Sequence, residues 1–250
     1  MPDPSALEYA FLGAAALVGG AVNAVAGGGS LVSFPALLAV GYPAVDANVT
    51  NSVALLPGYA AGSAAYRPEL AGQRRRAIAL GITCAAGSAA GTALLLTVSR
   101  SAFDEVVPFL VLLACGLLAA QPLLNRLVSR HRGHGSVPLH LAVFAGAVYG
   151  GYFGAGMGIT LLALLAAFIA DDLQRLNALK GLLSLVVSFV AAAVFALFGP
   201  VAWAAALIMA VGSVAGGYLG VGVARRMNDR VLRWVIVAYG VVVAVILFVT

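Results

Sequence analysis

Polar side chains interrupt an otherwise apolar chain at two places, and their chemistry suits a bound solute. Asparagines, serines and three consecutive glycines interrupt the first half, and glycines, an asparagine and Lys180 interrupt the second. Amide, hydroxyl and ammonium groups donate hydrogen bonds, and together they suit the oxygens of an anion. The candidate binding residues are Asn23, Gly27, Gly28, Gly29, Ser30, Asn48, Asn51, Ser52, Gly156, Gly158, Asn177 and Lys180.

The glycines at 27–29 and 154–158 predict two breaks in helices. Glycine runs are poor helix formers, so we expect one helix to end at each break and a short segment to follow. These segments are expected at 30–40, with Ser30 as the N-cap, and at 159–170. A helix that begins inside a membrane directs unpaired N–H groups and a partial positive charge at whatever lies before it. Such an end suits an anion, and glycine allows the backbone to approach it closely.

Asn51 and Ser52 lie three and four residues after Asn48, so both lie on the same side of a helix as Asn48. Their side chains could donate hydrogen bonds to an anion, or they could join neighbouring helices at about 0.6 to 2 kcal/mol each. Asn23 also has two interpretations: it caps the broken helix end, or it contacts the solute. The residues alone leave both alternatives open.

Lys180 lies about two turns into an apolar helix, where a charged group is costly and usually functional. We hypothesise that it is the positive element of an anion site. One alternative is that its long stem reaches the nearby membrane surface, and another is that it pairs with Asp171 or Asp172. These two acids could themselves relay protons, but adjacent acids at a segment end are more typical of a solvated loop.

The composition places these residues in a membrane. The chain is 62% hydrophobic and 9% charged, with a mean hydropathy of +1.04, whereas soluble domains carry about 25% charged residues. Because unpaired backbone groups cannot face lipid, the apolar runs are expected to be helices. The net charge of +5 does not indicate nucleic acid, since the arginines cluster at the ends of apolar runs. We expect an all-α, multi-pass protein of the cytoplasmic membrane, without a cofactor.

The second half of the sequence repeats the first. The chain is therefore expected to be a single transmembrane domain, 1–250, with internal repeats over approximately 5–128 and 138–250. It has no Gly-x4-Gly-Lys-Ser/Thr phosphate loop, so this chain alone is not an ATP-driven pump. The matches are Gly27/Gly156, Gly29/Gly158, Asn48/Asn177 and Asn51/Lys180 at an offset of 129, and the Gly-Ser-x-Ala-Gly motifs 87–91 and 212–216 at an offset of 125.

Charge sets the relative orientation of the two repeats. Eleven of the 14 basic residues lie in 67–76, 126–134 and 225–233. Basic loops face the cytoplasm, and placing all three there turns the second repeat upside down, with both termini outside. We expect two inverted repeats of about five membrane-entering helices each, in which the second helix is short and follows a glycine-rich break. The short helices either cross or re-enter, and the sequence favours neither. The expected segments are 7–26, 30–40, 46–66, 77–98, 106–128, 139–153, 159–170, 173–198, 201–224 and 231–249.

Inverted repeats with helices broken near the midplane are typical of secondary transporters. The motifs Asn23-x3-Gly27-x-Gly29 with Pro35, and Gly150-x3-Gly154-x-Gly156-x-Gly158, resemble the sulfite exporter TauE/SafE family, also called toluene sulfonate uptake permeases. The resemblance covers nearly the whole chain. It implies transport of small sulfur-containing anions, sulfite or organosulfonates, coupled to a gradient of protons or sodium ions. Met157 departs from the family, which often has glycine there, and this would alter the fit of the backbone to its ligand.

Three other functions serve as alternatives. An anion channel would share the broken helices but lack a turnover-limited, saturable flux. An intramembrane enzyme would need a nucleophile with a base, paired acids or a metal cluster within the spans. The sequence offers no such set, and His131, His134 and His140 lack acidic or thiol companions for a metal, so we expect neither an enzyme nor a metal site. A membrane assembly partner would not be stabilised by any small anion.

Overall fold

The computed structural model describes residues 2, 4–25, 27–128, 136–224 and 229–249. In this part of the chain all regular structure is helical, as the composition predicts, and each of the ten expected segments is a helix. Helix α5 begins six residues earlier than expected, because the mixed segment 100–105, with Phe103 buried, extends it beyond the apolar run. The elements are α1 (Ala6–Val25), α2 (Ser30–Ala39), α3 (Ala44–Ala65), the 3-10 helix η1 (Pro68–Leu70), α4 (Arg74–Thr97), α5 (Arg100–Val128), α6 (Ser136–Tyr152), α7 (Met157–Phe168), α8 (Leu173–Phe198), α9 (Trp203–Ala224) and α10 (Asp229–Val249).

The outer surface of the bundle is apolar. Four helices, α1, α4, α5 and α8, contain a stretch long and apolar enough to cross a membrane. Helices α4, α9 and α10 expose large apolar side chains, among them Ile82 at 68%, Val211 at 73% and Val242 at 56%. Water disfavours a continuous surface of this kind, whereas lipid is a suitable solvent for it. The chain is therefore an all-α integral membrane protein.

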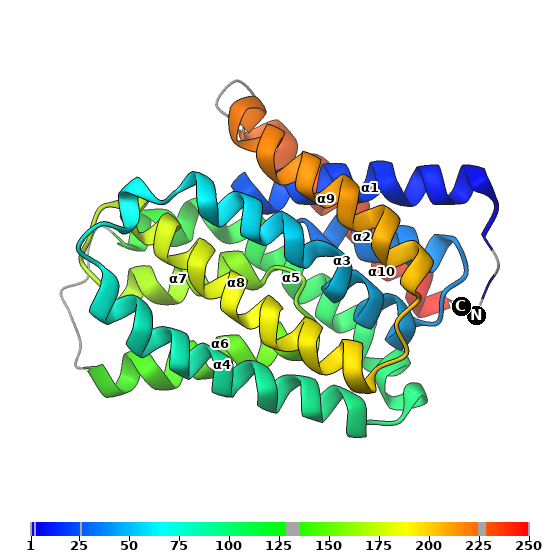
Figure 1. The fold of residues 1–250 in the computed structure, drawn as a ribbon, viewed down its shortest axis with the longest axis horizontal. Helices are drawn as coiled ribbons and strands as arrows, with labels where there is room; N and C mark the ends of the chain where they lie inside the picture. Colours follow the sequence, from blue (N-terminus) through cyan, green and yellow to red (C-terminus); the bar gives the residue numbers. More distant parts are fainter. Residues whose placement is uncertain (1, 3, 26, 129–135, 225–228, 250) are drawn as a thin grey trace.

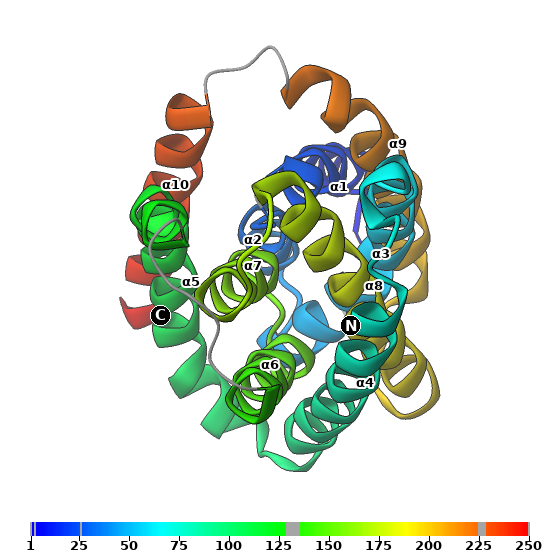
Figure 2. The same cartoon turned by 90° about the vertical axis from the view of Figure 1, so that its left-hand side faces the viewer.

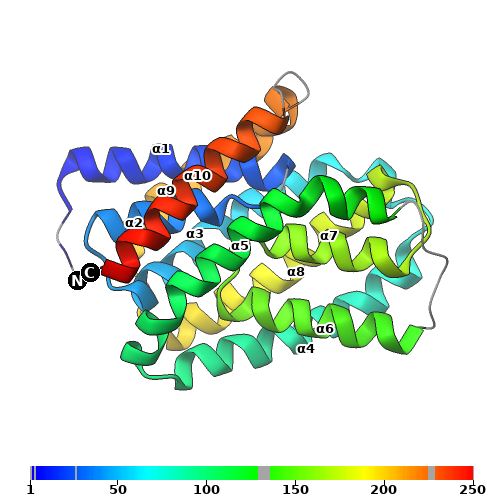
Figure 3. The same ribbon diagram turned by 180° about the vertical axis from the view of Figure 1, so that it is seen from behind.

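Two helical hairpins, α1 with α2 and α6 with α7, enter the bundle from opposite ends (Figures 1 and 3). We call the end where α1 begins and α10 ends the terminal end, and the end where α3 ends and α4 begins the basic end. The first hairpin opens toward the terminal end and the second toward the basic end, so α2 and α7 each turn back toward the end where the preceding helix began. Viewed from the basic end, α2 and α7 lie at the centre of the bundle (Figure 2).

Glycines allow the tips of the two hairpins to meet. Gly27 has a φ of +81°, and a Cβ atom added there would lie 2.7 Å from the Cα atom of Gly158. Gly154 and Gly156, with φ values of +79° and +73°, reverse the chain at the second tip. This left-handed backbone region favours glycine, and the close contact leaves no space for a side chain. The predicted breaks are confirmed.

Two details of the predicted breaks are wrong. Gly29, and not Ser30, is the N-cap of α2, and it provides no side-chain cap. The Asn23 side chain supplies the missing acceptor, because its Oδ1 accepts a hydrogen bond of 2.7 Å from the Gly29 N–H. Helix α7 begins at Met157, two residues earlier than expected, because the chain has already reversed direction before it. Gly158 therefore lies in the first turn of α7 and not in the break.

Helices α3 and α8 pack on each other and run antiparallel beside the hairpin tips. Helix α3 runs from the terminal end to the basic end, and α8 returns in the opposite direction. Positions late in α3 therefore lie level with positions early in α8. At the tips, Phe34 of α2 packs edge-on against Phe153, with ring centroids 5.3 Å apart. These elements frame the interior where the predicted polar residues lie.

Candidate functional site

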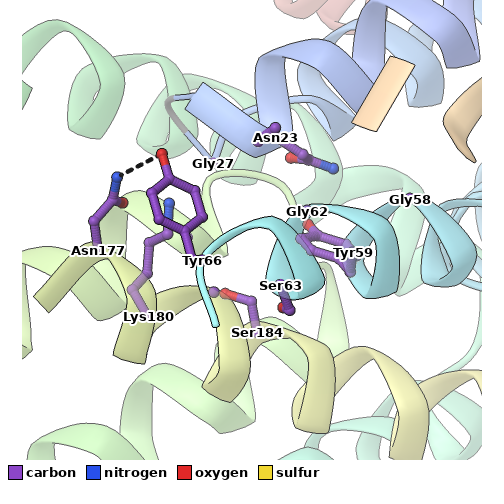
Figure 4. A pocket seen from close by; sticks show the side chains of 13 residues that line it. Asn23, Gly27, Gly58, Tyr59, Gly62, Ser63, Tyr66, Asn177, Lys180 and Ser184 are labelled. Atoms are coloured by element: carbon purple, nitrogen blue, oxygen red, sulfur yellow. Dashed lines mark hydrogen bonds between the residues drawn. The ribbon is translucent and has the colours of Figure 1, made fainter. Parts of the chain in front are cut away.

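A small cavity lies beside the hairpin tips, on the side that faces the basic end (Figure 4). The tip of α1, the start of α7, the second half of α3 and the first half of α8 contribute its walls. We call it the Lys180 cavity. Its lining residues are Asn23, Ala24, Gly27, Gly58, Tyr59, Gly62, Ser63, Tyr66, Gly158, Asn177, Lys180, Gly181 and Ser184.

Lys180 is the charged group of this cavity, and its side chain is buried. Only 4% of the residue is exposed, so its stem does not reach the membrane surface. None of the carboxylates that the structure describes forms a salt bridge with it. Asp171 pairs instead with two arginines, and Asp172 accepts a hydrogen bond from the Gln174 N–H at the start of α8. Neither of the two structural alternatives for Lys180 is therefore seen.

Three polar atoms in the wall of the cavity lack hydrogen-bond partners. They are Ser63 Oγ, Asn177 Oδ1 and Ser184 Oγ, and each is buried. Unsatisfied buried polar groups are rare in native proteins. The Asn177 Nδ2 is only weakly engaged, since it donates to the Tyr66 hydroxyl at 3.5 Å. The cavity thus combines a buried cation with hydroxyl groups that are free to donate to a ligand.

The tips of the hairpins contribute backbone and one amide to the cavity. Asn23 caps the break through Gly29, as described above, and it also lines the cavity. The two interpretations of Asn23 from sequence are therefore compatible. Gly27 and Gly158 bring bare backbone to the cavity wall at the point where the tips touch.

The predicted amide cluster of α3 lies away from Lys180 and has protein partners. Asn48 Nδ2 donates to the Tyr152 carbonyl oxygen at 2.9 Å, and Asn51 Oδ1 accepts from the Ser33 hydroxyl at 2.6 Å. Ser52 Oγ donates to the carbonyl oxygen of Asn48 at 2.9 Å. These bonds fasten α3 to α6 and α2, so ligand contact by this cluster stays a prediction.

The remaining predicted glycines and Ser30 are buried at the tips but do not line the Lys180 cavity. Gly28 faces the side chains of Ile159 and Leu118, and Gly156 faces Ala114. Gly29 approaches the carbonyl oxygen of Gly19 so closely that a Cβ atom there would overlap it. These residues shape the two breaks, and contact with a ligand stays a prediction for them too.

Sequence reasoning missed several lining residues that share a helix face with those it found. Tyr59, Ser63 and Tyr66 are three or four residues apart on α3, and Ser184 follows Lys180 by one turn of α8. Helical spacing therefore carried the signal. It was overlooked because single serines and tyrosines in apolar helices seldom indicate a site.

An ion-pair cluster lies at the basic end of the bundle. Asp171 contacts Arg76 and Arg175 at 2.9 Å each, and Gln73 Nε2 donates to the Arg175 carbonyl oxygen at 3.0 Å. Burial raises the pKa of Asp171, but hydrogen bonds from Arg76, the Asp172 N–H and Arg175 outweigh this, so the pKa lies below its ordinary value. The cluster ties the connection between α3 and α4 to the start of α8.

A cavity with a buried lysine lies where two broken-helix hairpins meet, inside an apolar helical bundle, and broken helices of this kind are typical of membrane transporters. Comparison with known families places this protein: it belongs to the sulfite exporter TauE/SafE family, whose profile matches residues 12–247. This confirms the resemblance noted from the motifs, and with it the assignment to membrane transporters.

Curated relatives carry matching descriptions. A probable membrane transporter protein of Haemophilus influenzae is 28% identical over 86% of this chain and 85% of its own length. One from a Sinorhizobium species is 24% identical over 98% of this chain and 94% of its own length. The probable membrane transporter protein YfcA of Escherichia coli K12 is 25% identical over 92% of this chain and 85% of its own length. Comparison with solved structures gives no match.

Proposed function

We propose that this protein is a secondary transporter that moves small sulfur-containing anions, sulfite or organosulfonates, across the cytoplasmic membrane through the Lys180 cavity. The observation that carries the proposal is the buried Lys180 ammonium, which no described carboxylate neutralises. A buried charge without a partner is strongly unfavourable, so an anion would complete the cavity. The free hydroxyls of Ser63 and Ser184 support the same ligand, because each would gain a hydrogen bond.

The proposed route lies between two inverted repeats. Hairpins that open toward opposite ends support this arrangement, and so do two serine contacts between corresponding helices. The Ser88 hydroxyl of α4 donates to the Val187 carbonyl oxygen of α8 at 2.8 Å, and the Ser213 hydroxyl of α9 donates to the Ala54 carbonyl oxygen of α3 at 2.9 Å. The two serines are the matched residues of the Gly-Ser-x-Ala-Gly motifs.

The proposed orientation puts the basic end in the cytoplasm. The arginines of 67–76 lie at this end in the structure, and basic loops favour the cytoplasmic side. Of the other two basic segments, residues 129–134 and 225–228 lie outside the described residues. With α1–α2 and α6–α7 as re-entrant hairpins, the remaining six helices would cross the membrane and leave both termini outside.

The donors in the cavity support the substrate class that the family description suggests. A sulfite or sulfonate group offers several negatively charged oxygens, and these could accept from Lys180, from the two hydroxyls and from an amide such as Asn23. Flux against a concentration gradient would require a coupling ion, a proton or sodium. Imposing a pH or sodium gradient on proteoliposomes would distinguish these two ions.

Binding provides the first test. The purified protein is heated with sulfite, sulfate, thiosulfate, sulfoacetate, taurine or simple carboxylates, because a ligand that binds only the folded state raises its stability, by about 2.7 kcal/mol at a hundred times Kd. Sulfur oxyanions are expected to stabilise the protein more than carboxylates do. Proteoliposomes then test whether sulfite flux saturates, as a carrier requires and a channel does not. Absence of any anion-induced shift together with absence of saturable flux would contradict the proposal.

A further inference from the structure

A second cavity lies on the other side of the hairpin tips. Four hydroxyl-bearing residues, Ser30, Ser52, Tyr59 and Ser188, line it together with tip residues of the second hairpin, and the Ser52 hydroxyl donates to the Asn48 carbonyl oxygen. Its α3 residues come earlier in that helix than those of the Lys180 cavity, and its α8 residues come later. Because α3 and α8 are antiparallel, both shifts move the cavity toward the terminal end. We call it the hydroxyl cavity.

Tyr59 lines both cavities, and no other residue of the described chain is common to the two linings. Its hydroxyl interacts with the side chains of Ser30 and Asn23. Ser30 belongs to the lining of the hydroxyl cavity, and Asn23 belongs to that of the Lys180 cavity. Because it belongs to both linings and has one neighbour from each, the aromatic side chain stands between the two cavities.

The two cavities occupy corresponding places in the two halves of the sequence. At the offset of 129, Ser188 corresponds to Tyr59, and Ser52 corresponds to Gly181 of the Lys180 cavity. The chemistry differs at one position. The counterpart of Lys180 is Asn51, a neutral amide engaged by Ser33, so the hydroxyl cavity lacks a cation from that position.

We propose that the hydroxyl cavity is a second binding station for the same small oxyanion, and that the Tyr59 side chain is the gate between the two stations. This inference rests on the proposed transport function. Neutral hydroxyl donors hold an anion less strongly than an ammonium group does, so the second station would release toward the terminal end what the first station captures. Passage requires the Tyr59 hydroxyl to leave Asn23 and Ser30 while the ring swings aside.

Two matched substitutions, one turn apart on α8, separate the stations. Ser184→Leu fills the Lys180 cavity and Ser188→Leu fills the hydroxyl cavity, with the same change in volume. We expect Ser184→Leu to abolish both sulfite-induced thermal stabilisation and sulfite flux in proteoliposomes. Ser188→Leu is expected to keep the stabilisation and to lower the flux at least tenfold. Wild-type flux in Ser188→Leu would overturn the inference and leave the proposed function intact.

Removal of the gate gives a second measurement that does not depend on filling a cavity. Tyr59→Ala joins the stations, so its sulfite flux is expected to rise and to lose saturation, while Tyr59→Phe keeps the ring and retains saturable flux. Saturable flux at the wild-type rate in Tyr59→Ala would overturn the gate. If the wild-type protein showed neither stabilisation nor flux with sulfite or an organosulfonate, the proposed function itself would fail, and this inference with it.

Discussion

Asn51 and Lys180 are matched residues of the two halves at the offset of 129, yet their surroundings differ. Asn51 lies in α3, 2% exposed, with its Oδ1 engaged by the Ser33 hydroxyl at 2.6 Å. Lys180 lies in α8, 4% exposed, with no carboxylate partner among the described residues. Under the proposed repeat, the two halves would supply two similar frames, and this side-chain difference would place the charge in one of them.

The largest expected effect concerns what the two halves share, the contact of the hairpin tips. Gly27→Ala would place a Cβ atom 2.7 Å from the Cα atom of Gly158 in a backbone of positive φ. Left-handed strain of about 1 to 2 kcal/mol and overpacking of about 1 to 3 kcal/mol should both destabilise the fold. Gly41→Ala is the matched control, since Gly41 has a φ of +95° with no atom within 4 Å.

Thermal unfolding of the two variants in detergent separates strain from contact. Gly41→Ala should lose only the backbone contribution, so its midpoint should lie between those of the wild type and Gly27→Ala. Equal midpoints for the two variants would show that the tips do not require bare backbone.

The next effect concerns what the two halves do not share. Lys180→Met should weaken sulfite binding by roughly tenfold to a hundredfold, because a hydrogen bond to a charged group contributes about 1.5 to 3 kcal/mol. Lys180→Arg keeps the charge with a different shape and should retain part of the affinity. Titration by thermal shift and initial flux rates measure both. Unchanged affinity in Lys180→Met would remove the charge from the proposed mechanism.

Lys180 is the single lysine of the chain, so its accessibility to ligand can be tested without substitution. Acetic anhydride should acetylate it slowly, and sulfite at about ten times its Kd should slow this reaction by roughly tenfold, because about a tenth of the sites stay free. Mass spectrometry of the peptide that contains Lys180 gives the rate. Acetylation of the amino terminus is an internal control for loss of reagent. Equal rates with and without sulfite would place the anion elsewhere.

The sequence predicts the helical fold of this protein more completely than it predicts the candidate binding site. The breaks at Gly27 and Gly156 could be predicted, because a glycine run in an apolar helix has few explanations. Lys180 was conspicuous as a lone charge in an apolar helix, but the sequence left open whether its stem is buried or reaches the membrane surface. The return of α2 and α7 toward the ends they came from could not be predicted, since a short apolar segment has the same composition whether it crosses or turns back.

The hydrogen-bond partners of the α3 amides also could not be predicted from the sequence. Asn48 and Asn51 look alike as donors to an anion, yet their partners, Tyr152 and Ser33, come from other helices and are set by packing. Tyr59 and Ser184 were missed because their role depends on which cavity each helix face meets. Local pattern identifies polar residues in a membrane, and tertiary contacts decide which of them are satisfied.

The smallest expected effect concerns the ion pairs at the basic end, which lie outside the proposed binding site. At the basic end Asp171 joins two arginines that are more than a third exposed, at 39% and 38%, so the pairs are screened and contribute about 0.2 to 1 kcal/mol. Because the folded-state pKa of Asp171 is lowered, this stability is present above the unfolded pKa of about 3.9 and is lost as pH falls through the folded value.

Asp171→Asn should therefore unfold at a slightly lower temperature than the wild type near neutral pH, and this difference should shrink below about pH 4. Arg76→Gln should behave in the same way with a smaller amplitude, because Arg175 remains. A difference that does not vary with pH would mean that Asp171 stabilises the connection by shape and not by charge.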